Sequence, residues 1–293
     1  MKSENAIGFQ SAVLAFVMWG ALPIYWKFLH DVPAEEILAH RIIWSVVFVY
    51  LILFFQRRTH ELWSALRDKR TVLLMTFSGI IIGTNWFTYI WAVNNDRVLE
   101  TSMGYFICPM VSVLLGFLFL QEKIRGLMKP SVLFALAGVL VISAGYGKFP
   151  FAGVYLAISF GFYGLFRKKV GVKPLPGLFL ETLTLTPVSV IYLVYVHMNR
   201  GGVFLTDTSD TLFLLGTGVA TSLPLLLYVA GASRIRLGTV GTLQYIAPTI
   251  AFFIGAFMYG EALGTAKIVT FVLIWIGVVL YLAQLYRDTK RPA

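Results

Sequence analysis

Charged residues and cysteines are scarce in this chain, and each shortage excludes a class of protein. Charged side chains make up 13% of the 293 residues and hydrophobic ones 58%, whereas a soluble domain carries about 25% charged residues. The expected solvent is therefore a lipid bilayer. The single cysteine, Cys108, excludes an internal disulfide and a cysteine-based metal site.

The sequence patterns of enzymes and of ATP-driven proteins are also missing. The four histidines, His30, His40, His60 and His197, are scattered without an HExxH pattern, and there is no glycine-rich phosphate loop. An intramembrane enzyme that acts on lipid would need paired carboxylates with histidine, a cluster that the sequence lacks. We therefore expect no enzyme, no cofactor, no metal and no ATP-driven mechanism.

Ten apolar segments follow one another with short loops between them. A membrane-spanning helix needs about 20 mostly apolar residues. Such segments lie at about 7–27, 34–55, 71–93, 105–122, 130–146, 150–166, 176–197, 211–232, 237–259 and 266–286. The sequence thus predicts an all-α polytopic membrane protein with ten transmembrane helices. Because no clear small-residue cleavage site is present, we expect the first segment to be a retained helix.

The net charge of +10 indicates basic cytoplasmic loops before it indicates nucleic-acid binding. With the N-terminus inside, 18 of the 24 lysines and arginines fall in cytoplasmic segments and 4 in the outside loops. This is the charge bias expected of a membrane protein. We expect both termini in the cytoplasm, the lipid bilayer as the surroundings, no nucleic acid and no obligatory protein partner.

One stretch of the sequence occurs twice, 139 residues apart. Residues 105–122 read YFICPMVSVLLGFLFLQE and residues 244–261 read QYIAPTIAFFIGAFMYGE, which pairs Pro109 with Pro248 and Glu122 with Glu261. Because each half has five helices, the second half crosses the membrane in the opposite sense. We predict two five-helix repeats, 1–147 and 148–293, with inverted topology. Further pairs at shifts of 139 or 141 are Gly79 with Gly218, Tyr89 with Tyr228, Arg97 with Arg236, Gly138 with Gly277 and Gly20 with Gly161.

Polar and aromatic side chains within these segments are candidates for a central binding site. They either form interfacial belts or line a polar-aromatic pocket for an amphipathic solute. Pro109 and Pro248 should bend their helices, and Glu122 and Glu261 are structural or gating candidates because they close helices. The substrate-binding candidates are Trp19, Asn85, Trp86, Tyr89, Tyr105, Tyr163, Tyr228, Gln244 and Tyr245.

Ionisable residues at membrane depth are costly, which makes them functional candidates. His40 and Arg41 lie roughly 10 Å into the second segment at ~1.5 Å per residue, and Glu181 lies near the start of the seventh. Glu181 either forms a structural ion pair with Arg41 or carries a proton. If the ion pair forms, His40 is the better proton switch. The coupling candidates are therefore His40, Arg41 and Glu181, with protons as the coupling ion.

Several segments resemble a known family of carriers. The stretches WGALPIYWK, AHRIIWS, NWFTYIWAVNN, ETSMGYFICPM and RKKVG, together with the duplication, resemble the EamA type of the drug/metabolite transporter superfamily and, within it, the RarD subgroup. The resemblance covers essentially the whole chain. It implies a bacterial inner-membrane carrier of a metabolite, amino acid or drug. It also implies a central cavity among the first, third, fourth, sixth, eighth and ninth helices.

These observations favour a secondary transporter, or permease, that moves a small organic solute by alternating access. Two alternatives remain open at this point: a facilitative, uncoupled exporter, and a membrane sensor or scaffold that transports nothing.

The predicted topology can be tested by cysteine labelling. A cysteine placed at Ser209 should react with an impermeant reagent added from outside, because its loop is periplasmic in the ten-helix topology. A cysteine placed at Ser64 should not react, because its loop is cytoplasmic. The reverse labelling pattern would contradict the topology.

Overall fold

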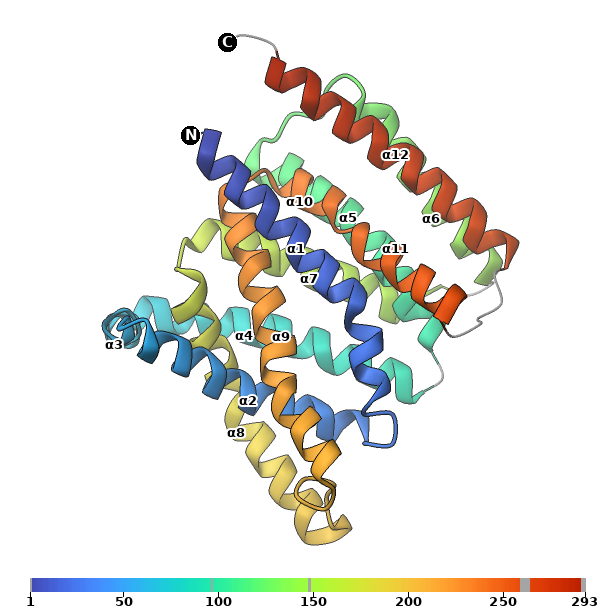
Figure 1. Cartoon of the computed structure of the whole chain (residues 1–293). Coiled ribbons are helices and arrows are strands. Elements are labelled where there is room, and N and C mark those ends of the chain that lie inside the picture. The colour runs from blue at the N-terminus through green and yellow to red at the C-terminus, as the bar shows by residue number, and fades with distance from the viewer. Residues whose placement is uncertain (1, 96, 147–148, 259–263, 291–293) are drawn as a thin grey trace.

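The computed structural model of the protein describes residues 2–95, 97–146, 149–258 and 264–290. Every regular element in these ranges is helical (Figure 1). In chain order the elements are α1 (Lys2–Lys27), α2 (Ala34–Phe55), α3 (Thr59–Arg67), α4 (Lys69–Asn94), α5 (Val98–Leu120), α6 (Met128–Tyr146), α7 (Phe151–Val170), α8 (Pro174–Arg200), α9 (Thr208–Arg234), α10 (Leu237–Leu243), α11 (Ile246–Phe253), a π-helical turn (Ile254–Met258) and α12 (Thr265–Lys290).

Eight helical runs among the described residues are long and apolar enough to cross a membrane. They belong to α1, α2, α4, α5, α8, α9, the combined run Leu237–Met258 and α12, while α6 supplies a shorter apolar stretch. The outward faces are apolar as well: Leu73, Val188 and Ile191 are 70%, 71% and 70% exposed. A soluble protein rarely exposes so much apolar surface. The fold is that of a multi-pass membrane protein.

The stretch 57–70 was expected to be a basic loop, but the structure places the short helix α3 within it. Leu62 is buried on one side of α3. The Glu61 carboxylate accepts hydrogen bonds from Lys173 Nζ (2.7 Å) and Arg58 Nη2 (2.9 Å). Lys173 first and Arg58 second lower the pKa of Glu61, so this link is present at neutral pH and weakens as the carboxylate becomes protonated in acid. It holds α3 against the start of α8.

The ninth expected segment, which the sequence predicted to be bent by Pro248, divides into α10 and α11 around Gln244. Pro248 explains the position of the break. A proline ring has no N–H to donate and clashes with the carbonyl four residues earlier, which is that of Gln244. The Gln244 N–H itself bonds to the carbonyls of Val240 (3.0 Å) and Gly241 (3.2 Å). Pro109, its partner in the repeat, lies within the uninterrupted α5.

Glycines mark the closest approaches between helices. Where α6 packs on α12 at one edge of the bundle (Figure 1), a Cβ on Gly138 would lie 3.2 Å from the carbonyl oxygen of Thr270. A Cβ on Gly277 would lie 2.8 Å from the carbonyl oxygen of Ser131. A larger residue at either position would push the two backbones apart.

Two further glycines allow close packing in the same way, one in each half of the chain. A Cβ on Gly20 of α1 would lie 2.7 Å from Ile250 of α11, and one on Gly161 of α7 would lie 2.7 Å from Val111 of α5. These contacts place α1 against α11 and α7 against α5.

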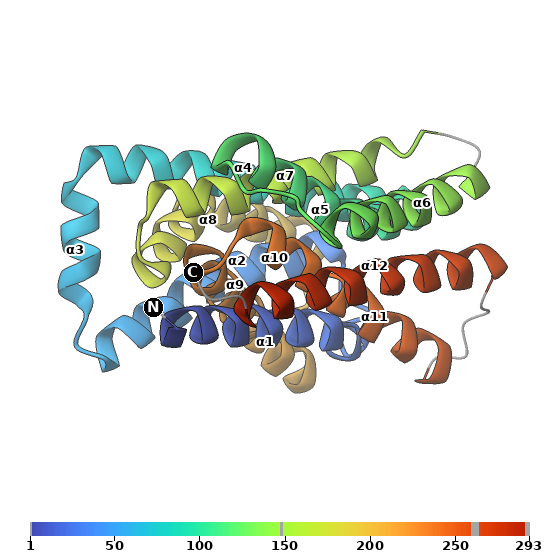
Figure 2. The same ribbon diagram turned by 90° about the horizontal axis from the view of Figure 1, so that it is seen from above.

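α5 and α10 also pack closely. A Cβ on Gly241 of α10 would lie 2.7 Å from the carbonyl oxygen of Pro109 and 2.8 Å from the Cβ of Ser112, both in α5. In the part of the chain that the structure describes, this close packing does not continue along α11. Figure 2 shows α10 beside α5 and α11 running away from it. The divergence of α5 and α11 helps to open a cavity.

Candidate functional site: a cavity at the centre of the bundle

A cavity of about 260 Å³ lies between helices from both halves of the chain. Its walls come from α1, α2, α4, α5, α7, α9, α11 and the break at Gln244. Most of the wall is apolar, with several aromatic rings, and polar side chains occupy a smaller part. The aromatic lining residues are Phe16, Trp19, Trp26, Trp86, Tyr89, Tyr105 and Phe160, and the polar ones include Arg41, Asn85, Thr101, Thr221 and Gln244.

Most of the residues proposed from the sequence as substrate-binding line this cavity. They are Trp19, Asn85, Trp86, Tyr89, Tyr105 and Gln244, and Pro248 lines it with them. Tyr163, Tyr228 and Tyr245 are not among its lining residues. Tyr163 and Tyr228 stack on each other in the buried core, with ring centroids 6.2 Å apart, and the Tyr245 hydroxyl donates to the Phe106 carbonyl (3.2 Å).

The sequence interpretation missed three aromatic lining residues, Phe16, Trp26 and Phe160. A helical spacing could have found two of them. Phe16, Trp19, Pro23 and Trp26 follow one another at intervals of three or four residues, which places them on one face of α1. No comparable pattern marks Phe160.

Arg41 projects into the cavity from α2. Its guanidinium carbon lies 5.0 Å from the ring centroid of Trp26 and 5.3 Å from that of Trp86, both within the range of cation–π attraction. Its Nε donates a hydrogen bond to Thr221 Oγ1 (2.9 Å). Of the described residues that line the cavity, Arg41 alone is charged.

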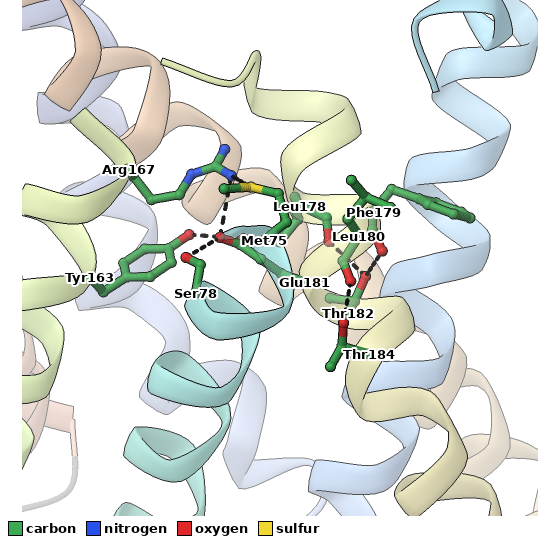
Figure 3. A network of polar contacts seen from close by, with 10 residues as sticks. All are labelled: Met75, Ser78, Tyr163, Arg167, Leu178, Phe179, Leu180, Glu181, Thr182 and Thr184. Atoms are coloured by element: carbon green, nitrogen blue, oxygen red, sulfur yellow. Dashed lines mark hydrogen bonds and ion pairs between the residues drawn. The ribbon is translucent and has the colours of Figure 1, made fainter. Parts of the chain in front are cut away.

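Glu181 is paired with Arg167, so the suggested pair with Arg41 is wrong. Arg167 Nη1 lies 3.2 Å from Glu181 Oε1, and both side chains are fully buried (Figure 3). Ser78 Oγ donates to the same carboxylate at 2.5 Å and Tyr163 at 3.3 Å. The sequence placed Arg167 in a cytoplasmic loop, but α7 extends to Val170 and carries it into the protein. Glu181 does not line the cavity.

His40 precedes Arg41 but points away from the cavity lining. Its Nδ1 accepts a hydrogen bond from Trp44 Nε1 (3.1 Å), and its ring lies 4.8 Å from that of Phe204. Neighbouring residues on a helix point in directions about 100° apart. Of the three coupling candidates, only Arg41 therefore lines the cavity.

Glu122 closes one end of the α5–α10 contact. Its two carboxylate oxygens accept hydrogen bonds from the backbone N–H groups of Leu237 (2.6 Å) and Gly238 (2.9 Å) at the start of α10. Arg236 Nε lies 3.8 Å from the same carboxylate. A carboxylate in this position satisfies N–H groups that have no partner within the helix. Its repeat partner, Glu261, lies outside the described residues.

Comparison with known proteins matches the chain twice to one family model, "EamA-like transporter family", at residues 6–144 and 149–283. The chain belongs to the EamA-like transporter family. This confirms the resemblance suggested by the sequence, and the family indicates membrane transport rather than catalysis.

Relatives of this EamA-family chain include proteins of several bacteria. An uncharacterized transporter YojE of Bacillus subtilis is 44% identical, covering 95% of this chain and 94% of that protein. Protein RarD of Salmonella typhi is 40% identical, covering 96% of each. A chloramphenicol-sensitive protein RarD of Pseudomonas aeruginosa is 28% identical over 92% and 91%. A solved crystal structure, 19% identical, matches the fold with a TM-score of 0.74, covering 99% of this chain and 100% of its own.

The Arg167–Glu181 pair can be tested through stability. Arg167→Met should lower the free energy of unfolding by about 3–5 kcal/mol, because it leaves a buried carboxylate without its cation. The readout is the melting temperature of the purified protein in detergent. Arg167→Met/Glu181→Leu should recover most of the loss.

A matched control is Lys173→Met, which removes an ion pair whose lysine side chain is 64% exposed. It should cost less than about 1 kcal/mol. Equal melting temperatures for Arg167→Met and Lys173→Met would show that the buried pair does not stabilise the fold.

Proposed function

We propose that the protein is a secondary transporter that moves a small organic solute across the bacterial inner membrane by alternating access to the central cavity. The observation that carries this proposal is the shape of the space between α5 and the broken ninth segment. It is closed where α5 packs on α10 and Glu122 binds the α10 N-terminus. It is open where α5 and α11 diverge around the cavity.

An inverted repeat of two five-helix halves is supported by contacts that occur in matching pairs. Gly138 meets Thr270 and Gly277 meets Ser131, and both the glycines and their partners are 139 residues apart. The helix pairs correspond as well: α1 with α9 matches α4 with α7, and α1 with α11 matches α5 with α7. Such repeats are the architecture of alternating-access carriers.

The α5–α10 contact has no matching contact between α5 and α11 among the described residues. We therefore take it as the contact that changes between the two conformations. A shift of 139 residues relates Ser112 to Ala251 and Gly241 to Ser102. The contact between Ser112 and Gly241 is formed, whereas Ala251 lines the cavity. In the opposite conformation the two halves exchange roles. α5 and α11 then meet at Ser102 and Ala251, and α5 separates from α10. With both termini in the cytoplasm, the described conformation is closed toward the cytoplasm.

The size of the cavity suits a small solute. At about 260 Å³, it lies just below the range of about 300–1,000 Å³ that is typical of sites for drug-sized ligands. Two alternatives stay open: an uncoupled exporter would move the solute without a coupling ion, and a sensor or scaffold would move no solute. Proton coupling through His40 or Glu181 stays a prediction, and any such role would act from outside the cavity wall, where both residues lie.

Paired cysteines test the exchange of contacts without knowledge of the solute. In a Cys108→Ala background, Ser112→Cys/Gly241→Cys and Ser102→Cys/Ala251→Cys should each form a disulfide in oxidised membranes. The first traps the described conformation, after a slight separation of the helices because a Cβ on Gly241 would lie only 2.8 Å from that of Ser112. The second traps the opposite conformation. Each disulfide should stop the release of endogenous metabolites that distinguishes cells with the protein from cells without it, and a reductant should restore that release.

The control pair is Phe134→Cys/Gly277→Cys between α6 and α12. A Cβ on Gly277 would lie 3.5 Å from the Phe134 Cβ, within the usual disulfide range of about 3.5–4.5 Å, although it would also lie 2.8 Å from the Ser131 carbonyl oxygen, so the two helices must shift slightly to accept it. Its disulfide should form without stopping release, because this interface is already symmetric. If the Ser102→Cys/Ala251→Cys pair never cross-links, alternating access by this exchange is wrong. If no metabolite is released, the sensor or scaffold alternative is favoured.

A further inference from the structure

We propose that the cavity binds a small organic monoanion, an aromatic or otherwise apolar carboxylate, and that Arg41 holds its carboxylate. The transport of this solute rests on the proposed function, whereas its binding does not. The inference comes from the charge of the cavity, from the contacts that hold the Arg41 guanidinium, and from the apolar residues in the rest of the wall.

The cavity contains a positive charge without a matching carboxylate among the described residues. Arg41 is the one charged lining residue among them, and the described acids that are buried or nearly so bind other groups. Glu36 accepts the Val203 N–H (2.8 Å), Glu181 pairs with Arg167, and Glu122 binds the α10 N-terminus. An unpaired charge at membrane depth is costly, so an anion that enters the cavity gains the attraction that no described acid supplies.

The guanidinium is fixed in place but keeps free donors. The indoles of Trp26 and Trp86 lie on it, and its Nε bonds to Thr221. Neither Nη group of Arg41 has a hydrogen-bond partner in the protein among the described residues. A guanidinium that is held in this way matches the two oxygens of a carboxylate and loses little further freedom on binding.

Two hydroxyl groups near Arg41 can add to the binding of an anion. The rings of Tyr89 and Tyr105 have centroids 6.4 Å apart, and both hydroxyl groups lie close enough to Arg41 to interact with its charge. Both residues line the cavity. A phenol hydroxyl can donate its proton, and a carboxylate oxygen is a natural acceptor.

The rest of the described wall favours a ligand whose remaining part is apolar, and it has no carboxylate to bind a cation. Phe16, Trp19, Phe160 and Leu225 line the cavity, and aromatic rings bury large areas of a planar ligand. The described lining residues include no carboxylate that could pair with an ammonium group. A zwitterionic amino acid would therefore find its carboxylate recognised and its ammonium group unpaired.

A purely structural role for Arg41 makes a different prediction. If Arg41 only joins α2 to α1, α4 and α9, its removal lowers stability and leaves ligand preference unchanged. The test must therefore compare ligands that share one body and differ in charge.

The probes are 3-phenylpropanoate, its neutral amide, phenylalanine and phenethylamine, each titrated against the purified full-length protein. Binding is read as the concentration-dependent rise in melting temperature. We expect 3-phenylpropanoate to bind about ten- to hundred-fold more tightly than the amide, the range of a hydrogen bond to a charged group. Arg41→Gln should abolish this preference, and Arg58→Gln, which changes an arginine outside the cavity, should retain it.

Arg41→Lys keeps the charge without the two-pronged donor, so it should retain a weaker preference for the acid, and it serves if Arg41→Gln does not fold. Equal binding of acid and amide, no binding of either, or tightest binding of phenethylamine would overturn the proposal. Phenylalanine binding as tightly as the acid would overturn the restriction to monoanions. A different outcome would reject only the proposed transport: the acid binds more tightly than the amide and the control disulfide forms, but the Ser102→Cys/Ala251→Cys pair does not cross-link.

Discussion

The bilayer offers no water to satisfy a polar group, and the arrangement of this protein follows from that constraint. Backbone that leaves the helix must be covered by protein or border a cavity. The break at Gln244 does so, since Gln244 lies in the cavity wall and its N–H stays within the chain. The fully buried Arg167 and Glu181 pair with each other, Glu122 binds the N–H groups of a helix start, and Arg41 borders the cavity.

In the proposed inverted repeat, the described contacts between the two halves include a symmetric one, between α6 and α12, and an asymmetric one, between α5 and the broken segment. α6 and α12 meet through glycines on both sides of their crossing. α5 meets α10 on one side only and separates from α11 on the other. A contact that already satisfies the symmetry has no reason to change between conformations. In the proposed alternating-access cycle, a contact formed at one end is exchanged for its counterpart, so the motion would concentrate between α5 and the broken segment.

Sequence patterns predicted the position of most helices because apolar length is a local property. α2 begins and ends where expected, and eight of the ten expected segments are long and apolar enough, among the described residues, to cross a membrane. They also found the aromatic and amide residues of the wall, such as Trp19, Asn85 and Trp86, since polar groups at membrane depth are rare. They could not tell which way a side chain turns. The orientation of one helix decides whether Arg41 meets Glu181 or the cavity, and the extra length of α7 decides that Arg167 is buried. Both depend on packing between distant segments.

If the proposed carrier cycle operates, the guanidinium of Arg41, the one charge among the described lining residues, also makes the carrier sensitive to membrane potential. When the empty carrier changes orientation, the positive charge of Arg41 moves within the transmembrane electric field. A cell interior that is 100 mV negative then favours the inward-facing orientation by up to about 2.3 kcal/mol. A bound monoanion cancels the charge, so the loaded carrier has no such preference. The voltage would therefore return the empty carrier to the cytoplasmic side and drive net movement outward. In this way the charge of one arginine would set the direction of net transport.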